Sequence, residues 1–253
     1  LESLRRYCVR NLMSALDGDF PMQAYVDDLL TRVTAQSARQ YITVVKMFFK
    51  HIGHPVEFSF KAPSAQIKAN KTKRLERWFS DKEVDLCREW DFPNAQSDLI
   101  RHRNRALVGM LIDTGARISE IAAIRAQDVV FQKRTAHLGV SKTQPRAGFF
   151  SEQTEGHLLE FKSYKDWSAE IFPPADRCKH IVIDMLKDLK IHKPGRGPHT
   201  FRHWVANRLY FDKGMDIIDV AFLLGDSPEV IRKTYLHPTP EQMRRRLQKA
   251  MAA

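Results

Sequence analysis

The sequence predicts a mainly α-helical protein with one small antiparallel β-sheet, divided into a helical N-terminal domain and a larger C-terminal domain. Apolar residues recur at helical spacing along most of the chain, strand-like segments are confined to one short region, and a polar basic stretch separates two apolar regions. The chain has 253 residues, of which 43% are hydrophobic and 28% charged. This composition is typical of a globular protein, and the length fits one large domain or two smaller ones.

The N-terminal domain is predicted to span residues 1–67 and to be helical. Apolar residues lie at helical spacing in residues 23–30 and again in residues 38–51. Ser37 is the predicted N-cap of the second helix, and Gly53 follows its predicted end.

Residues 68–77 are predicted to link the two domains, because this stretch is polar and strongly basic. Two interpretations stay open. The stretch is either a solvated loop, as charge runs usually are, or a strap across a phosphate backbone. The candidate phosphate contacts are Lys68, Lys71, Lys73, Arg74 and Arg77.

The C-terminal domain, residues 78–253, is predicted to begin with a helix that Ser80 caps, since Glu83 completes a capping box. An amphipathic helix over residues 103–112 leads to a turn at Gly115 and a short helix. Two strands are predicted over residues 129–140 and 148–150, joined by a turn at 142–147. Further helices are predicted over residues 180–189, 199–212, 217–224 and 230–235, and from residue 240 onwards.

The charge balance favours a polyanionic partner. Lysine and arginine number 41 against 30 aspartate and glutamate, which gives a net charge of +11 and points to nucleic acid or an anionic membrane surface. No apolar run approaches the ~18 residues that span a bilayer, and the chain does not open with a signal-peptide pattern. Cys8, Cys87 and Cys178 are far apart and form no CxxC motif, which favours reduced thiols. We therefore expect a cytoplasmic protein.

Arg117 is a first candidate functional residue, because it follows the turn at Gly115 and stands at the predicted start of a helix. A helix N-terminus offers free N–H groups and the positive end of the helix dipole, and a guanidinium adds a bidentate anion ligand. The alternative is a surface arginine paired with a carboxylate, which is the commoner environment of an arginine.

His199 and Arg202 are three residues apart, so on a helix they share one face and place a proton donor beside a fixed cation. His203 lies four residues after His199, which is also the spacing of a zinc-binding histidine pair. However, Thr200 stands where the metalloprotease motif has glutamate, and no third ligand is near in the sequence. We therefore predict no metal site.

Tyr235 lies beyond the turn at Gly225 and downstream of His199 and Arg202, which makes it a candidate nucleophile. The alternative is an ordinary core or surface tyrosine. Lys142 lies in the predicted turn between the two strands, where most lysines are only solvated.

Together and in this order, these features resemble the tyrosine recombinase (phage-type integrase) family. The family's first motif, Thr-Gly-x-Arg-x-Ser-Glu-Leu, is similar to residues 114–121, and its second, His-x-Leu-Arg-His-x-Phe-Ala, is similar to residues 199–206. Its third, Leu-Gly-His-Ser-Ser with a Tyr-x-His further on, is similar to residues 224–237 except at Asp226. The resemblance covers residue 78 to the C-terminus in order and spacing, and it is only generic before that.

The resemblance implies that the protein breaks and rejoins DNA strands without metal, ATP or another cofactor. It implies that Tyr235 is the nucleophile and becomes a 3′-phosphotyrosine, while Arg117 and Arg202 clamp the scissile phosphate. It further implies that His199 assists proton transfer and that Lys142 is the general acid that protonates the leaving 5′-oxygen.

Two positions of this predicted site are open. Lys133 is an alternative to Lys142 as the general acid. Asp226 stands where most of the family has a histidine, sometimes a tryptophan, that donates a hydrogen bond to the phosphate. An ionised carboxylate cannot donate this bond, and a phosphate repels it. Either Asp226 turns away to bond a backbone or basic group, or the clamp works with fewer donors.

The resemblance also implies the partners. It implies double-stranded DNA as the substrate, a DNA core-binding role for residues 1–67, a homotetramer on two DNA sites and a location at the nucleoid. A C-terminal helix that docks on a neighbouring protomer would suit the apolar residues Met243, Leu247 and Met251. The main alternative is a DNA-binding protein of the same fold with weak or lost cleavage. A type IB topoisomerase shares the chemistry, but the short chain and small helical N-terminal region favour a recombinase.

Overall fold

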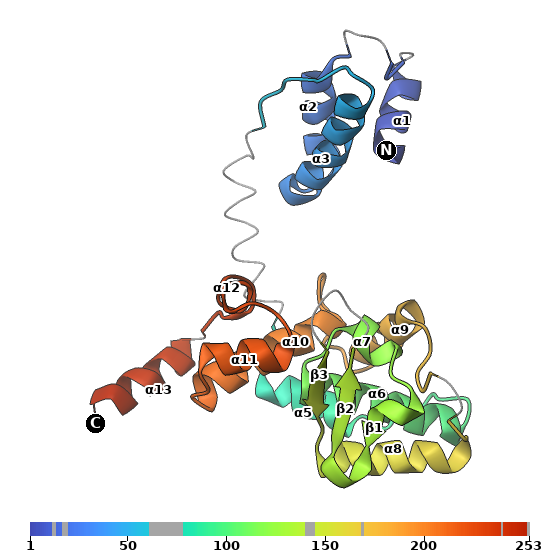
Figure 1. Ribbon diagram of the computed structural model, residues 1–253, viewed down its shortest axis with the longest axis vertical. Helices are drawn as coiled ribbons and strands as arrows, with labels where there is room; N and C mark the ends of the chain where they lie inside the picture. The colour runs from blue at the N-terminus through green and yellow to red at the C-terminus, as the bar shows by residue number, and fades with distance from the viewer. Residues whose placement is uncertain are drawn as a thin grey trace. The chain divides into compact units, whose positions relative to one another are not determined.

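The computed structural model describes residues 1–11, 14–16, 20–60, 78–139, 145–167, 170–238 and 240–251 (Figure 1). The chain divides into two compact units, Leu1–Glu76 and Arg77–Ala253. The predicted functional boundaries at residues 67/68 and 77/78 stay predictions, because the linker lies outside the described residues.

The described part of the N-terminal unit contains three helices: α1 (Glu2–Arg10), α2 (Met22–Arg32) and α3 (Ala35–His51). Each helix turns an apolar face inward, and aromatic rings fill much of the space between them. Edge-to-face and tilted ring contacts join Tyr7, Phe20, Tyr25 and Phe49.

The prediction that Ser37 caps the second helix is wrong. Helix α3 begins at Ala35 because Thr34 is its N-cap, and the Thr34 hydroxyl accepts a hydrogen bond from the backbone N–H of Ser37 at 3.2 Å. Ser37 is thus inside the first turn. The helix ends at His51, as predicted, and Gly53 follows with a left-handed φ of 80°.

The C-terminal unit combines helices with one small sheet, which confirms the predicted fold class. Its helical elements are α5 (Asp81–Glu89), α6 (Asp98–Thr114), α7 (Ile118–Ala122), η1 (Ala126–Asp128), η2 (Phe131–Lys133), α8 (Glu152–Tyr164), α9 (Ala175–Asp188), α10 (Pro198–Asn207), η3 (Arg208–Asp212), α11 (Ile217–Leu224), α12 (Pro228–Val230), η4 (Ile231–Tyr235) and α13 (Pro240–Met251).

Helix α6 is the centre of this unit, and α5, α8 and α10 pack against it. It begins at Asp98, capped by Ser97, five residues before the predicted start. The predicted core residues Ala106, Leu107, Met110 and Leu111 are all fully buried. The predicted capping box of α5 is also confirmed, with Ser80 and Glu83 bonding each other's backbone N–H groups.

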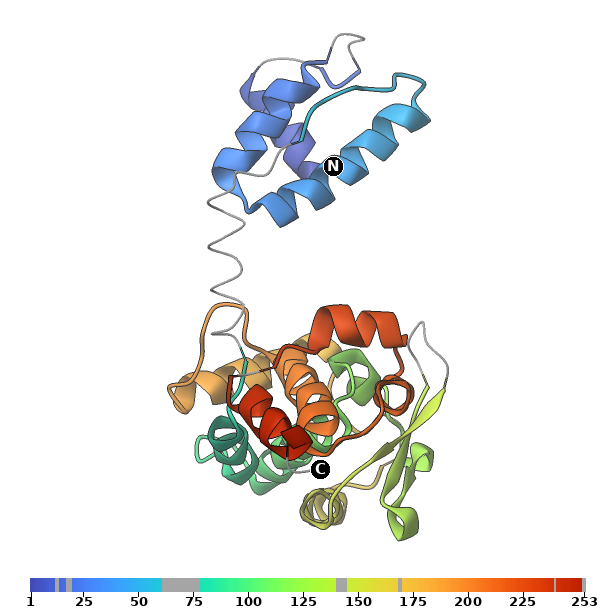
Figure 2. The same ribbon diagram turned by 90° about the vertical axis from the view of Figure 1, so that its left-hand side faces the viewer.

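The sheet has the antiparallel order β1 (Val129–Val130), β2 (Thr135–Leu138) and β3 (Arg146–Phe149), and it lies at one edge of the unit (Figure 2). The predicted strand over residues 129–140 is therefore two strands, separated by a tight turn in which Arg134 has a φ of 47°. Helix α8 directly after the sheet is a helix that the sequence patterns did not predict. Its N-cap Ser151 precedes a first turn in which every side chain is polar, so apolar spacing gives no signal there.

The last elements position the chemistry-bearing side chains. Helix α10 continues into η3, α11 ends at Gly225 with a left-handed φ of 66°, and η4 ends at Tyr235. The side chains of α10, α11 and η4 share an apolar cluster that includes Val205, Val220 and Ile231. No helix in the described part of the chain combines the length and apolar character that crossing a bilayer requires.

Candidate active site

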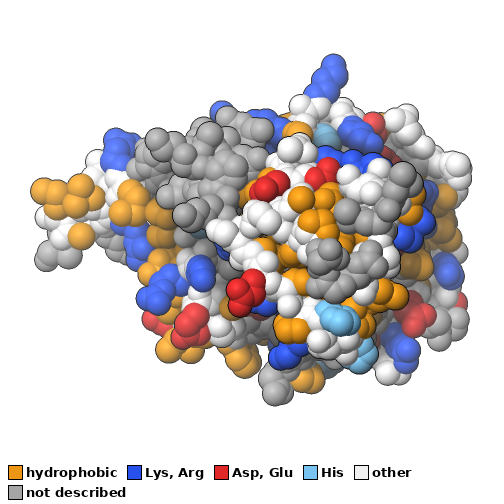
Figure 3. Space-filling view, turned by 90° about the horizontal axis from the view of Figure 1, so that it is seen from above, with side chains coloured by type: hydrophobic (Ala, Val, Ile, Leu, Met, Phe, Trp, Pro, Cys, Tyr) orange, Lys and Arg blue, Asp and Glu red, His pale blue; other side chains and the backbone are white. Residues whose placement is uncertain are grey.

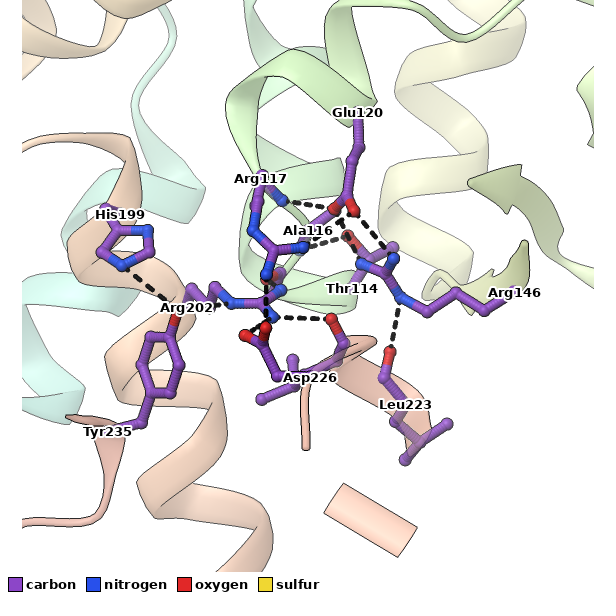
Figure 4. Close-up of polar contacts among 12 residues, drawn as sticks. Thr114, Ala116, Arg117, Glu120, Arg146, His199, Arg202, Leu223, Asp226 and Tyr235 are labelled. Carbon is purple, nitrogen blue, oxygen red and sulfur yellow. Dashed lines mark hydrogen bonds and ion pairs between the residues drawn. The ribbon is translucent and has the colours of Figure 1, made fainter. Parts of the chain in front are cut away.

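Five of the residues singled out from the sequence converge in the C-terminal unit (Figure 4). They are Arg117, His199, Arg202, Asp226 and Tyr235. Arg117 caps α7, His199 and Arg202 lie on α10, Asp226 follows the end of α11, and Tyr235 ends η4. Lys142 lies outside the described residues, as do the basic linker residues Lys68, Lys71, Lys73, Arg74 and Arg77.

Arg202 is the centre of the cluster and is completely buried. Its guanidinium donates to the carbonyl oxygens of Gly115 at 3.0 Å and Leu224 at 2.6 Å. It also donates to the Tyr235 hydroxyl at 3.1 Å and to Asp226 Oδ2 at 2.6 Å. A buried charge is tolerated only when it is fully hydrogen-bonded, and these contacts hold Arg202 in one orientation.

Arg117 is the N-cap of α7, and its side chain reaches two carboxylates. Its backbone N–H donates to Glu120 Oε2 at 2.7 Å, and its guanidinium donates to Glu120 Oε1 at 3.2 Å and to Asp226 Oδ1 at 2.5 Å. With 26% of the side chain exposed, Arg117 forms the open side of the cluster. It is paired with carboxylates, as the simpler interpretation of this arginine expected, but it is not isolated on the surface.

Asp226 joins the two candidate clamp arginines. Its Oδ1 accepts from Arg117 and its Oδ2 from Arg202, and its side chain is 12% exposed. Asp226 bonds basic groups, but it does not turn away from the predicted site to do so. The carboxylate lies between the same two guanidinium groups that were singled out as anion ligands.

A second ion pair, Arg146 with Glu120, was not found by sequence reasoning. Arg146 donates to both oxygens of Glu120 at 2.8 and 2.7 Å, and its Nε donates to the Leu223 carbonyl oxygen at 2.9 Å. Burial alone raises the pKa of Glu120, but hydrogen bonds from Arg146 and from the Arg117 backbone outweigh it and hold the pKa at about 2. No local pattern around Arg146 signals this role, since its partner is 26 residues away.

The Tyr235 side chain is almost fully buried, at 3% exposure, between a cation and a histidine. Its hydroxyl accepts from Arg202 Nε and lies 3.3 Å from His199 Nε2. Burial raises the pKa of Tyr235, partly opposed by Arg202, so the phenol is protonated at neutral pH. Burial lowers the pKa of His199, and the nearby cations Arg202 and Arg117 lower it further. The imidazole is therefore neutral at neutral pH.

Neighbouring side chains fix the backbone and the ring of Tyr235. Asn207 donates to the Tyr235 carbonyl oxygen at 2.7 Å and accepts from the backbone N–H of His237 at 3.0 Å. The His203 ring lies 4.7 Å from the Tyr235 ring, and burial followed by the nearby His199 lowers the pKa of His203 to about 3. Among the described residues, no group of three or more His, Cys, Asp or Glu side chains is arranged to hold a metal ion.

Comparison with known proteins identifies the family. Residues 77–242 match the model of the phage integrase family, and the chain belongs to this family of tyrosine recombinases. The predicted enzyme family is thereby confirmed. The chain is 24% identical over 229 residues to the tyrosine recombinase XerA of Saccharolobus solfataricus, covering 88% of this chain and 70% of that protein. It is 26% identical over 188 residues to the tyrosine recombinase XerC of Treponema denticola, covering 65% of this chain and 60% of that protein.

Solved structures share the fold. The site-specific recombinase XerH bound to its difH substrate matches with a TM-score of 0.69 at 16% identity, over 97% of this chain and 76% of XerH. The crystal structure of an XerA recombinase matches with a TM-score of 0.58 at 22% identity, over 90% and 80% of the two chains. A lambda integrase dimer bound to a core site matches with a TM-score of 0.63 at 15% identity, over 94% and 71%.

Proposed function

We propose that this protein is a site-specific DNA recombinase that cleaves and rejoins DNA strands through a 3′-phosphotyrosine at Tyr235. The observation that carries the proposal is the environment of the Tyr235 hydroxyl. It lies 3.1 Å from a buried guanidinium and 3.3 Å from a histidine nitrogen, inside a cluster of arginines. An ordinary core tyrosine needs only one hydrogen-bond partner, and it does not need a charged cluster.

The arginines suit the charge that develops in the reaction. When the phenol oxygen attacks phosphorus and the bond to the 5′-oxygen breaks, negative charge grows on the non-bridging oxygens. Guanidinium groups fixed in advance stabilise this transition state more than the ground state. Arg202, held by two backbone carbonyl groups, and Arg117, open to solvent, are the proposed clamp. This scheme uses neither metal nor ATP.

Proton transfers complete the proposal. The Tyr235 phenol loses its proton as it attacks, and neutral His199 is the proposed acceptor, because its Nε2 lies next to the hydroxyl. The leaving 5′-oxygen needs a proton, for which Lys142 stays the proposed donor. The alternative donor, Lys133, is exposed at the end of η2.

The proposed partner is double-stranded DNA. The net charge of +11 supports it, as do the relatives XerH and lambda integrase, which are solved on their DNA sites. We further propose a tetramer on two DNA sites. Helix α13 supports this assembly, because 51% of Met243, 62% of Leu247 and 79% of Met251 are exposed. Apolar and basic side chains lie close together at the left of Figure 3, on the side where Figure 1 places α13.

The test is a trap for the covalent intermediate. Nicked duplexes from DNA that flanks the gene are mixed with protein, quenched with SDS and separated on a gel. We expect a protein–DNA adduct that Tyr235→Phe abolishes while DNA binding persists. Tyr164→Phe is the matched control, because Tyr164 is 51% exposed on α8 and contacts none of the five converging residues. An undiminished adduct in Tyr235→Phe would refute the nucleophile assignment.

A second candidate is a DNA-binding protein of this fold that no longer cleaves. The Asp226 carboxylate favours it, because it engages both proposed clamp residues. Sequence-specific binding without any adduct, on a site shown to be bound, would support this candidate.

A further inference from the structure

We propose that, in the DNA-free protein, the Asp226 carboxylate occupies the binding position of the scissile phosphate. Cleavage then begins only after Asp226 has broken its ion pairs with Arg117 and Arg202. This inference rests on the proposed function of the two arginines. It assigns Asp226 a regulatory role as an internal competitor of the substrate.

The contacts of Asp226 match those expected for a phosphodiester. A carboxylate and a phosphodiester each present two equivalent oxygens on one atom and carry one negative charge. Here one oxygen accepts from Arg117 at 2.5 Å and the other from Arg202 at 2.6 Å. Guanidinium groups bind both kinds of anion through the same donors.

The charge balance also permits the exchange. Three guanidinium groups, Arg117, Arg146 and Arg202, meet two carboxylates, Glu120 and Asp226. If Asp226 leaves and a phosphodiester enters, the cluster keeps the same total charge. If both stay, two anions face each other and repel.

Only the side chain of Asp226 has to move. Its backbone is held by a hydrogen bond from its N–H to the Ala221 carbonyl oxygen at 3.1 Å. The preceding turn is fixed by Arg146, which binds the Leu223 carbonyl, and by Arg202, which binds the Leu224 carbonyl. The side chain is 12% exposed and meets the partly exposed Arg117, so it can rotate towards solvent.

The test measures inorganic phosphate binding through thermal unfolding, at constant ionic strength with chloride as the reference anion. A ligand that binds the folded state raises Tm by mass action. We expect phosphate to raise the Tm of Asp226→Asn and to leave wild type nearly unchanged, with an apparent affinity at least tenfold higher in the variant. Asp219→Asn, an exposed residue of α11, removes the same charge and should behave as wild type.

A double variant locates the binding. The phosphate response of Asp226→Asn should disappear in Asp226→Asn/Arg117→Gln. If Asp226→Asn fails to fold, Asp226→His serves in its place, and the same gain in phosphate response is expected. Equal phosphate responses in wild type and in the folded variant would overturn the proposal, as would a response that survives loss of Arg117.

The outcomes separate this inference from the proposed function, because the phosphate measurement involves neither DNA nor Tyr235. A phosphate response confined to Asp226 variants would support the competitor role even if the covalent trap gave no adduct. Conversely, a Tyr235 adduct together with equal phosphate responses in wild type and Asp226→Asn would support the recombinase function and refute the role of Asp226 as a competitor.

Discussion

Two carboxylates in the C-terminal unit each bind two arginines, and they differ in how far solvent reaches them. Glu120 binds Arg146 and Arg117, and Asp226 binds Arg202 and Arg117. The Glu120 and Arg146 side chains are only 1% and 3% exposed, whereas Asp226 is 12% and Arg117 26% exposed. Arg117 belongs to both bridges.

This difference in exposure gives the two bridges different roles: one holds the arginines in place, and the other lies where an anion can bind. The Glu120 bridge is closed, because Arg146 and Arg117 both donate to its two oxygens and the side chain is only 1% exposed, so it can only fix the positions of its neighbours. The Asp226 bridge is open on the Arg117 side, where another anion can approach. A site that binds DNA phosphate needs both features: cations fixed in position by buried partners, and a face that is accessible to the phosphate.

The largest effect is expected from breaking the closed bridge. Glu120→Gln leaves the Arg146 charge buried without an anion, and removal of one partner of a buried pair costs about 3–5 kcal/mol in the free energy of unfolding. Urea unfolding measures it. The matched control is Glu170→Gln, which removes the exposed partner of Arg125 and should cost about 0–1 kcal/mol. Equal losses in the two variants would contradict the assignment of Glu120 as support.

A methyl group between the two bridges should have the next largest effect. Gly225 has a φ of 66°, and a Cβ there would lie 2.7 Å from a terminal nitrogen of Arg146. Gly225→Ala therefore combines left-handed strain with displacement of Arg146, for an expected loss of about 2–3 kcal/mol. Gly214→Ala is the control, because Gly214 has a φ of 70° and no atom within 4 Å of the added Cβ. It should lose about 1 kcal/mol.

Breaking the open bridge should cost less. Asp226→Asn removes an anion from Arg202, but Arg202 keeps the carbonyl oxygens of Gly115 and Leu224. We expect the free energy of unfolding to fall by about 1–2 kcal/mol, measured by urea unfolding in a phosphate-free chloride buffer. A loss as large as that of Glu120→Gln would show that the two bridges do not differ as proposed.

His203, which packs against Tyr235, should make stability depend on pH, an effect that vanishes near neutral pH. The pKa of His203 is lowered to about 3 in the folded protein, against 6.5 unperturbed. The unfolded chain then binds more protons below pH 6.5, so stability is lost as pH falls from 6.5 towards 3. Glu120, with a pKa of about 2, stays ionised throughout most of this range. The Tm of wild type should fall between pH 6.5 and 5. His203→Gln should reduce that slope without abolishing it, because the pKa values of His157 and His199 are also lowered.

The sequence was informative where residues act in short motifs. Arg117, His199, Arg202 and Tyr235 are singled out by their positions near helix and glycine turns together with the resemblance to the family motifs, and these four residues lie close together in the structure. The main features of the fold were also predictable, since apolar periodicity reports buried helix faces. The N-cap of α3 is misplaced because Thr34 and Ser37 are both good cap residues, and the apolar pattern does not distinguish them.

Long-range pairing was not predictable. Glu120 and Arg146 are 26 residues apart, and Asp226 and Arg117 are 109 residues apart. Nothing in the local sequence of either partner reports the other. For Asp226, the departure from the family motif indicated an unusual position, but only the geometry shows that its carboxylate bridges both arginines.

The most direct test of this account is to map the amino acid that becomes linked to DNA. The adduct formed with a nicked duplex is digested with protease and nuclease, and mass spectrometry locates the residual nucleotide. The account predicts that the nucleotide is attached to Tyr235 through a 3′-phosphate. Attachment to any other residue, or through a 5′-phosphate, would contradict it.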